Sequence, residues 1–261
     1  GHPMENVSPE TTVIDGYKWP DPSDPQRISG LREKAVRFRE EGKLVMLKGL
    51  CAGIFEMQQR FRGVSNALVD PFLYPGFSDR LIGKIADLKI LFWQTALKEL
   101  ADVVDVVAEA DDYGTQESQL IDPDYFRQLY KPHISRIIKS IEEAAPAARI
   151  MFHSCGNVRP LIPDFIEMGI DIINPVHINA EGMEPYQLKK DFGNDIVFWG
   201  GGVDTQKILP SGSASDVADD VKRNIDALAP GGGFVFATVH NIQAEVPPAN
   251  IAAMLKAIGR L

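Results

Sequence analysis

A histidine and a cysteine two positions apart are the residues best suited to chemistry in this sequence. His153 and Cys155 come directly after the apolar run Arg149–Phe152. Imidazole and thiolate both bind a borderline-soft cation such as zinc, and a thiol beside a histidine is also a candidate nucleophile. The structural alternative is a buried thiol next to a hydrogen-bonded histidine, because free cysteine behaves as a small apolar residue. Metal binding ranks above the nucleophile, since the sequence indicates no third residue that would orient the histidine.

A catalytic zinc site needs a further ligand, because such sites usually have three protein ligands and one open position. His240 follows the last apolar run of the chain and is the candidate for this third ligand. His177 is a weaker candidate and is better explained as a loop histidine. Cys51 has no histidine neighbour and is interpreted as a structural thiol. The predicted metal ligands are therefore His153, Cys155 and His240.

Three carboxylates form a second cluster. Glu109, Asp111 and Asp112 follow the apolar run Val103–Ala108. Clustered carboxylates can bind a cation, or one of them can donate a proton when its pKa is raised. A solvated turn is the alternative, but three acids directly after a buried strand favour a function. We therefore predict Asp111 and Asp112 as catalytic residues. His240, which follows the last apolar run, is predicted as a third catalytic residue.

These side chains need a scaffold that brings them together. Short apolar runs without alternation suit strands that are buried on both faces, and they are Leu44–Leu47, Val103–Ala108, Arg149–Phe152, Asp171–Pro175, Ile196–Trp199 and Phe234–Val239. The stretches with a helical pattern are Ile28–Glu41, Ser78–Leu100, Pro123–Ala144, Val158–Glu167, Pro185–Asp191, Ala214–Leu228 and Pro248–Ile258. This alternation predicts a parallel sheet with right-handed crossovers. In such folds, catalytic groups collect where the carboxyl ends of the strands meet.

Polar residues or glycines follow every predicted strand, which indicates a site at that edge of the sheet. The candidates for substrate binding are Gln116, Asn174, Gly201, Asp204 and Gln243. Gly200–Gly202 follows a strand, so its backbone can come close to a ligand. Gly231–Gly233 precedes a strand and predicts a tight turn. Neither glycine run matches a dinucleotide-binding or phosphate-binding loop.

The composition argues against several classes of partner. The 261 residues carry a net charge of −9, and an acidic surface without a Lys/Arg block does not attract nucleic acid or anionic lipid. The two cysteines form no disulfide framework and indicate a reducing compartment. No apolar stretch is long enough to span a bilayer and no export signal is apparent, so a cytoplasmic protein is expected. Without a linker or a low-complexity segment, residues 1–261 are predicted to form a single domain.

Several motifs resemble the uroporphyrinogen decarboxylase superfamily. They are Phe152-His153-Ser154-Cys155-Gly156-Asn157-Val158, Asn174-Pro175-Val176, Phe198-Trp199-Gly200-Gly201-Gly202-Val203-Asp204, His240-Asn241-Ile242-Gln243 and Val246-Pro247-Pro248-Ala249-Asn250-Ile251. The resemblance runs from Trp19 to the end of the sequence. It implies an α/β fold of the (β/α)8, or TIM-barrel, type. The six predicted strands would then be the third to the eighth, and the N-terminal part of the family domain would be absent.

Within the superfamily, the chain is most similar to methyltransferases that move methyl groups between corrinoid proteins and thiols or methoxylated compounds. Their His-x-Cys pair corresponds to His153 and Cys155, and their third zinc ligand, usually a cysteine, corresponds to His240. The resemblance implies zinc-assisted methyl transfer, a small-molecule substrate and a partner protein that carries a corrinoid. A homo-oligomer is a further candidate assembly.

Two alternatives remain open. The first is a metal-free decarboxylase of a polycarboxylate, with His240 near the substrate. The loops after the strands contain few Lys or Arg, however, and nothing in the chain matches the substrate-binding arginines and key aspartate of the porphyrinogen decarboxylases. The second is an accessory barrel without catalytic activity, because an open barrel would leave two unpaired sheet edges that favour association.

Overall fold

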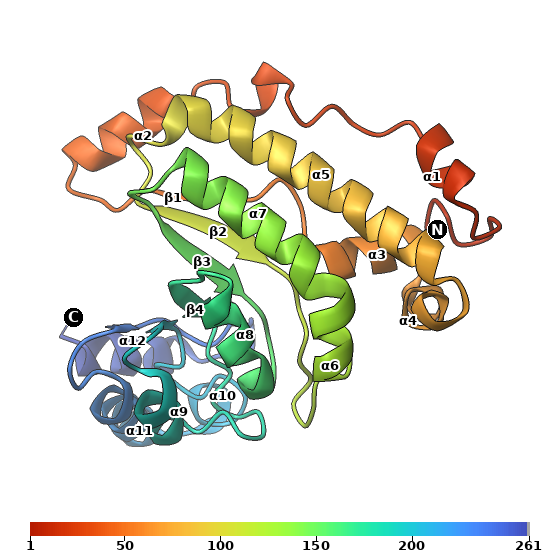
Figure 1. Ribbon diagram of the computed structural model, residues 1–261. Helices are drawn as coiled ribbons and strands as arrows, with labels where there is room; N and C mark the ends of the chain where they lie inside the picture. The colour runs from red at the N-terminus through yellow and green to blue at the C-terminus, as the bar shows by residue number, and fades with distance from the viewer. Residues whose placement is uncertain (260–261) are drawn as a thin grey trace. The chain divides into compact units, whose positions relative to one another are not determined.

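The computed structural model describes residues 1–259 as an α/β protein (Figure 1). Within these residues the sheet has six strands, which follow one another in chain order from β1 to β6. β1 pairs with β2, β4 with β5, and β5 with β6, each time in parallel. Parallel neighbours need a crossover connection, and here helices supply it. The predicted alternation of helices with the strands of a parallel sheet is therefore confirmed.

The strands are short and lie where the apolar runs predict them. They are β1 (Met46–Lys48), β2 (Val106–Ala110), β3 (Arg149–His153), β4 (Ile172–Asn174), β5 (Val197–Trp199) and β6 (Phe234–Val235). The last is shorter than the run Phe234–Val239 predicts. Beyond Val235 the pairing becomes incomplete, although the amide of Gly202 still donates to the carbonyl of Ala237 at 2.9 Å. The backbone after β6 therefore stays bonded to the segment after β5 without forming a full ladder.

The described residues form two compact units. The first unit comprises Gly1–Asp112, Asp122–Phe152 and Glu167–Ile170, and the second comprises Tyr113–Ile121, His153–Ile166 and the chain from Asp171 onward. The single domain expected for residues 1–261 stays a prediction.

The core of the first unit contains two long helices that pack against each other, α5 (Pro75–Leu100) and α7 (Lys131–Ala144). In α5, buried side chains recur at every fourth position from Leu81 to Leu97, which forms one apolar face. Lys89 occupies a position in the middle of this face and is only 2% exposed. A charged group on an apolar face requires a buried partner.

The structure contains two helices between β1 and α5 that the sequence pattern does not predict. They are α3 (Ile54–Arg62) and α4 (Val64–Leu73), separated by Gly63. Gly63 has a φ of 76°, a left-handed conformation that favours glycine and lets one helix follow the other directly. The buried residues of α4 are Ala67, Asp70 and Pro71. Because its large apolar side chains lie on the other face, α4 lacks the pattern of an ordinary surface helix.

The second unit contains β4 to β6 together with α9 (Pro185–Phe192), α11 (Ala214–Leu228) and α12 (Pro248–Ala257). Its core includes a buried cluster made of Val203, Leu209, Val217, Val221, Val246 and Met254. α11 begins with a capping box, in which Ser213 Oγ accepts from the Asp216 amide and the Asp216 carboxylate accepts from the Ser213 amide. This cap explains why the helix begins where the pattern for 214–228 predicts it.

The remaining elements are α1 (Thr11–Gly16), η1 (Pro25–Arg27), α2 (Leu31–Glu40), α6 (Pro123–Tyr125), the π-helical turn η2 (Phe126–Tyr130), η3 (Arg159–Leu161), α8 (Ile162–Glu167) and α10 (Ile208–Ser211). Among residues 1–259, no helix combines the length and the apolar composition that crossing a membrane requires.

Candidate functional site

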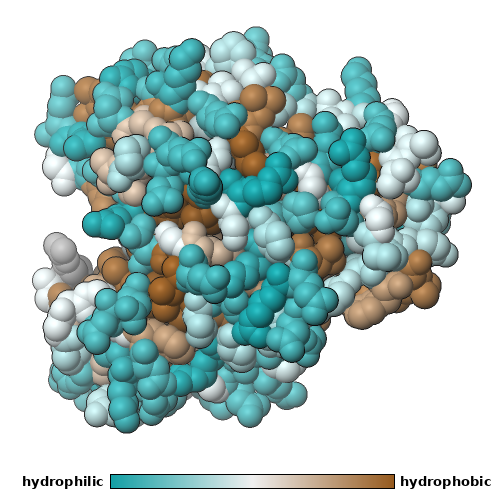
Figure 2. All heavy atoms as spheres, viewed as in Figure 1, coloured by the Kyte–Doolittle hydropathy of each residue, from teal (hydrophilic) through white to brown (hydrophobic). Residues whose placement is uncertain are grey.

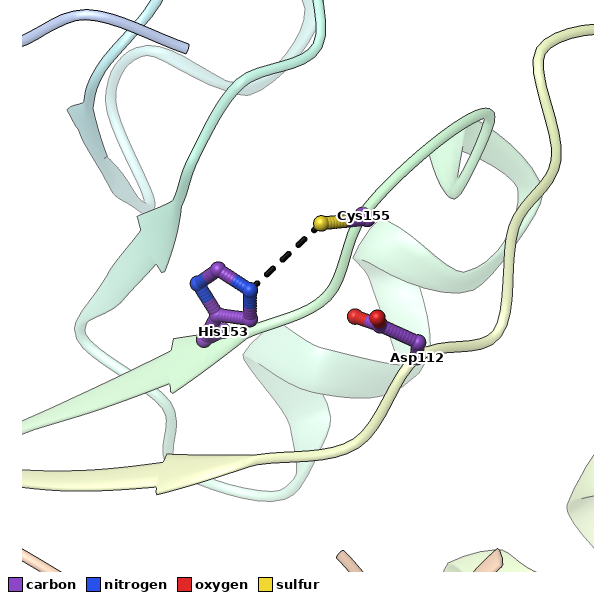
Figure 3. A group of neighbouring side chains, drawn as sticks. All are labelled: Asp112, His153 and Cys155. Carbon is purple, nitrogen blue, oxygen red and sulfur yellow. Dashed lines mark hydrogen bonds between the residues drawn. The ribbon is translucent and has the colours of Figure 1, made fainter. Parts of the chain in front are cut away.

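His153 and Cys155 lie together at the carboxyl end of β3. His153 is the last residue of the strand, and the Cys155 Sγ atom is 3.4 Å from the His153 Nε2 atom (Figure 3). Both side chains are half-buried, so they combine a restricted environment with access from solvent. The adjacency that the spacing predicts for this pair is present in the structure.

Asn174, the last residue of β4, determines how His153 is oriented. The Asn174 Nδ2 atom donates to the carbonyl of Trp199 at 2.8 Å, and the Oδ1 atom is 2.6 Å from His153 Nδ1. A carbonyl can only accept, so Oδ1 of this amide faces the imidazole and must accept from Nδ1–H. The lone pair of the neutral ring therefore resides on Nε2, which faces Cys155. Asn174 is predicted from the sequence as a substrate-binding residue, but its contacts in the structure are those of a positioning residue.

The loop that carries Cys155 is held by contacts of Ser154 and of Gly156, the residues on either side of the cysteine. The Ser154 amide donates to the Asn174 carbonyl at 2.8 Å, and the Ser154 hydroxyl accepts from the Tyr113 amide at 3.1 Å. Gly156 has a φ of 80°, and a Cβ atom there would lie 2.4 Å from the carbonyl carbon of Gly114. Only glycine fits this close approach of two backbones.

His177 supports the same loop from the other side. Its Nδ1 atom accepts from the Gly156 amide at 3.1 Å. The side-chain Nε2 atoms of Gln116 and Gln206 each lie 3.1 Å from the Nε2 atom of the ring. His177 thus joins the segments after β2, β4 and β5 to the Cys155 loop. Its position in the sequence predicts only a loop histidine, and no local signal indicates this supporting role.

Asp112 completes a group of three side chains that carry ligand atoms. One ligand atom from each of Asp112, His153 and Cys155 lies within 4.8 Å of the other two (Figure 3). Asp112 is half-buried and directly precedes Tyr113, whose amide is held by Ser154 between the histidine and the cysteine. The local backbone therefore places the carboxylate beside the pair.

The donor set of these three residues fits a zinc ion. It offers one nitrogen, one sulfur and one oxygen, all of which are zinc ligands. In a tetrahedral site with bonds of about 2.0–2.3 Å, neighbouring ligand atoms are roughly 3.5 Å apart. The 3.4 Å between His153 Nε2 and Cys155 Sγ agrees with this separation. A fixed tautomer that is held by a hydrogen-bonded amide is also typical of metal-binding histidines.

His240 and Gln243 are both exposed. His240 belongs to no cluster of three ligand-bearing side chains in residues 1–259. The carbonyl of His240 accepts from the Thr238 hydroxyl at 2.7 Å, and Gln243 Nε2 donates to the Asn241 carbonyl at 3.1 Å. The described geometry therefore has Asp112, rather than His240, beside the His153–Cys155 pair.

The Asp111 carboxylate accepts hydrogen bonds at the start of a helix. It is 1% exposed, and its two carboxylate oxygens accept from the amides of Phe55 at 2.8 Å and Glu56 at 3.0 Å, at the N-terminus of α3. Gly53 must be glycine because a Cβ atom there would lie 2.0 Å from Asp111 Cγ. These contacts stabilise the first turn of α3, whose amides have no partner within the helix.

Glu109 is the buried partner of Lys89. The Lys89 Nζ atom is 2.9 Å from Glu109 Oε2, and Trp93 Nε1 donates to Glu109 Oε1 at 2.5 Å. Burial alone would lower the pKa of Lys89, but the nearby Glu109 carboxylate more than offsets this and the pKa is raised. The neighbouring Cys51 thiol has its pKa raised by burial. Sequence reasoning missed Lys89, although its place on the apolar face of α5 is a signal that could have indicated it.

The two remaining candidates for substrate binding hold the backbone after β5. Gly201 has a φ of 72°, and a Cβ atom there would lie 2.9 Å from Ile178 Cγ2. Asp204 is 9% exposed, and its Oδ1 atom accepts from the amides of Gln206 and Lys207 and from Asn179 Nδ2. Both residues therefore have packing or turn-forming contacts.

Comparison with known proteins agrees with this architecture. Residues 4–261 match the protein-family model described as uroporphyrinogen decarboxylase (URO-D). A methyltransferase from Methanosarcina mazei has a similar structure, with a TM-score of 0.72 and 19% sequence identity over 98% of this chain and 70% of that one. Native xylanase 10B from Thermotoga maritima is similar at a TM-score of 0.52 and 8% identity, over 98% of this chain and 83% of the xylanase.

At these identities the two solved structures support the fold alone, and the predicted α/β fold of the TIM-barrel type is confirmed. The family match covers nearly the whole sequence and agrees with the resemblance carried by the His153 and His240 motifs. The chain belongs to the uroporphyrinogen decarboxylase family.

Proposed function

We propose that this chain is a methyltransferase-like enzyme that binds zinc through His153, Cys155 and Asp112. The observation that carries the proposal is the 3.4 Å contact between His153 Nε2 and Cys155 Sγ, on a histidine whose Nδ1 atom is already held by Asn174. Membership of the family and the structural similarity to a methyltransferase support an enzyme of this kind.

The residues of the proposed site are either zinc ligands or residues that position a ligand. The Cys155 thiolate and the His153 Nε2 atom bind the ion, and the Asp112 carboxylate supplies a third ligand. Asn174 holds the imidazole in the tautomer that presents Nε2, and His177 holds the Gly156 amide so that the Cys155 loop keeps its shape. Such outer contacts raise the affinity of a site without touching the metal.

Zinc bound there would act as a Lewis acid that lowers the pKa of a coordinated thiol or other heteroatom. The proposed reaction moves a methyl group between a corrinoid carried by a partner protein and a small thiol or methoxylated substrate. Three protein ligands leave a fourth position for the reacting heteroatom. The half-buried position of His153 and Cys155 is compatible with a small substrate that enters from solvent.

Zinc content tests this proposal. Elemental mass spectrometry is performed on protein purified without chelators, for the wild type and for Cys155→Ser, Asp112→Asn and His240→Ala. We expect one zinc per chain in the wild type, its loss in Cys155→Ser, a weaker site in Asp112→Asn and an unchanged site in His240→Ala. Loss in His240→Ala with retention in Asp112→Asn would restore His240 as the third ligand. A wild type without zinc would contradict the metal site.

A second candidate function uses the same pair without a metal. Cys155, His153 and Asn174 are in the order thiol, imidazole, amide, an arrangement in which histidine activates a thiol nucleophile. The sequence indicates no orienting residue for His153, whereas Asn174 has that position in the structure. A zinc-free wild type whose Cys155 is alkylated much faster than in Asn174→Ala would favour this function. A zinc-free wild type that releases CO2 from a porphyrinogen would instead favour decarboxylation.

A further inference from the structure

A cavity of about 250 Å³ lies in the first compact unit, next to the carboxyl end of β1. Its wall is mostly apolar, whereas most of the surface that Figure 2 shows is hydrophilic. A concave, mainly apolar pocket with a few polar groups is the usual form of a small-molecule site. The residues that determine the chemistry of this cavity are Trp19, Arg27, Cys51, Met57, Phe61 and Lys89.

One wall of the cavity is aromatic. The Trp19 and Phe61 rings pack on each other with centroids 4.9 Å apart, and the edge-on Tyr17 ring is 4.9 and 5.5 Å from their centroids. Trp19 Nε1 donates to the Ile14 carbonyl at 2.9 Å, which holds the indole in place. Met57 adds a polarisable thioether, and such a group makes favourable contacts with aromatic rings. This wall therefore suits a flat aromatic ligand.

Arg27 is the cation that the cavity offers to a ligand. It is exposed and so lies at the opening, and its Nε atom donates to the Asp21 carbonyl at 2.8 Å. Within residues 1–259 its guanidinium takes part in no ion pair. The Asp21 carboxylate accepts instead from the Ser23 amide and hydroxyl, at 2.8 and 2.6 Å. The two Nη groups of Arg27 are therefore available to a carboxylate, which guanidinium binds through paired N–H donors.

The other polar groups of the cavity add no charge that a ligand must meet. Lys89 is 2% exposed, and its Nζ atom is 2.9 Å from Glu109 Oε2. The same atom donates to the carbonyls of Ala52 and Cys51, at 3.1 and 3.4 Å, so all three of its N–H groups have partners. Lys89 therefore offers the cavity only its aliphatic stem. Burial raises the pKa of the Cys51 thiol, so this sulfur stays uncharged at neutral pH.

We propose that this cavity binds a small aromatic carboxylate of the benzoate class. The ring packs against Trp19 and Phe61, and the carboxylate accepts from the Nη groups of Arg27. At about 30 Å³ for a group the size of a water molecule, 250 Å³ holds roughly eight such groups. This size matches a single substituted ring and excludes a tetrapyrrole. None of the proposed zinc ligands lines the cavity, so the inference does not depend on the zinc site.

Isothermal titration calorimetry of the wild-type chain with benzoate, benzamide and acetate tests the proposal. Benzamide keeps the ring but lacks the charge, whereas acetate keeps the charge but lacks the ring. We expect saturable binding of one benzoate per chain, about 10-fold weaker binding of benzamide and no saturation with acetate. A wild type without saturable benzoate binding overturns the proposal. Equal affinities for benzoate and benzamide would overturn the role of the Arg27 guanidinium.

Two variants and a matched control assign the binding to this cavity. Arg27→Gln should weaken benzoate binding about 10-fold and leave benzamide binding unchanged. Arg37→Gln removes an exposed arginine of α2 that does not line the cavity, so it should change neither affinity. Cys51→Phe fills the cavity with a ring and should abolish benzoate binding, and circular dichroism checks that all three variants are folded. Unchanged benzoate binding in Cys51→Phe would contradict the assignment.

Alkylation of Cys51 provides a readout on the wild-type chain that needs no variant. Iodoacetamide is uncharged and does not compete for Arg27, and peptide mass spectrometry distinguishes Cys51 from Cys155, the other cysteine of the chain. Saturating benzoate should slow the alkylation of Cys51, which lines the cavity, and leave that of Cys155 unchanged. A rate at Cys51 that does not respond to bound benzoate overturns the proposed location.

Discussion

The carboxyl ends of β2 and β3 look equally reactive in the sequence, but they differ in the structure. At the carboxyl end of β2, Glu109 and Asp111 are 4% and 1% exposed, and their carboxylate oxygens have donors in Lys89, Trp93 and the first turn of α3. At the carboxyl end of β3, His153 and Cys155 are half-buried, and His153 Nε2 lies 3.4 Å from Cys155 Sγ. The partner of His153, Asn174, orients the ring and leaves Nε2 directed at the thiol.

The difference teaches that burial combined with complete hydrogen bonding marks a structural polar residue. A polar side chain that is partly exposed and oriented by a remote partner is better suited to chemistry. Asp111 and Asp112 show the distinction within two residues. Successive side chains in an extended segment point to opposite sides, so Asp111 faces α3 whereas Asp112 lies beside His153 and Cys155. Adjacent acids of the same type thus acquire different roles.

The largest effect that can test this comparison is expected for Glu109→Gln. The change removes the carboxylate that the buried Lys89 ammonium contacts, and removing one partner of a buried ion pair costs about 3–5 kcal/mol of stability. Urea denaturation measures the free energy of unfolding. The zinc content of the folded fraction should equal that of the wild type. A stable Glu109→Gln protein without zinc would show that Glu109 belongs to the chemical site instead.

A smaller effect is expected for Asn174→Ala, and it should act on metal binding. Without the amide, Nδ1 of His153 loses the contact that fixes the tautomer, and such outer contacts change metal affinity about 10–100-fold. Competition with a chromophoric zinc chelator measures the affinity. Asn179→Ala is the control, because Asn179 donates to Asp204, which is not one of the proposed zinc ligands. Equal zinc affinity in Asn174→Ala and the wild type would contradict the positioning role.

Asp111→Ala and Asp112→Ala are expected to separate the two neighbouring acids. Asp111→Ala removes the acceptor of two amides at the start of α3 and should lower stability by about 1–2 kcal/mol, as the loss of a helix cap does. Asp112→Ala should leave stability within about 0.5 kcal/mol and weaken zinc binding. Thermal denaturation and zinc titration of both variants check this. The reverse pattern would mean that the two roles have been exchanged.

The smallest effect on stability is expected for Asp102, a carboxylate on the surface, because a surface ion pair contributes little to the free energy of folding. The hydrogen bond from Arg32 to Asp102 lowers the pKa of Asp102 from its ordinary 3.8 to about 2. A lowered pKa stabilises the fold above pH 3.8, and this contribution is lost as the pH falls through about 2. NMR titration of the Asp102 carboxyl carbon should give a midpoint near 2 in the wild type. In Arg32→Ala the midpoint should move up toward 3.8, and an unchanged midpoint would exclude the pair as the cause.

Much of the scaffold could be predicted because it depends on local patterns. The six apolar runs coincide with the six strands of residues 1–259, and the helical stretch 214–228 coincides with α11. α4 could not be found in this way, because its apolar side chains face outward and its inner side is held by the Arg62–Asp70 pair. Periodicity assumes that apolar side chains are buried, and a helix that contradicts the assumption gives no usable signal.

The sequence by itself determined the positions of the strands, the family resemblance and the adjacency of His153 and Cys155, since all three depend on residues close together in the chain. Only the tertiary structure decided that Asn174 orients His153, that His177 supports the Cys155 loop and that Asp112 rather than His240 lies beside the pair. Those contacts join residues that are tens of positions apart. Their geometry depends on how strands and loops are brought together, which short-range patterns do not encode.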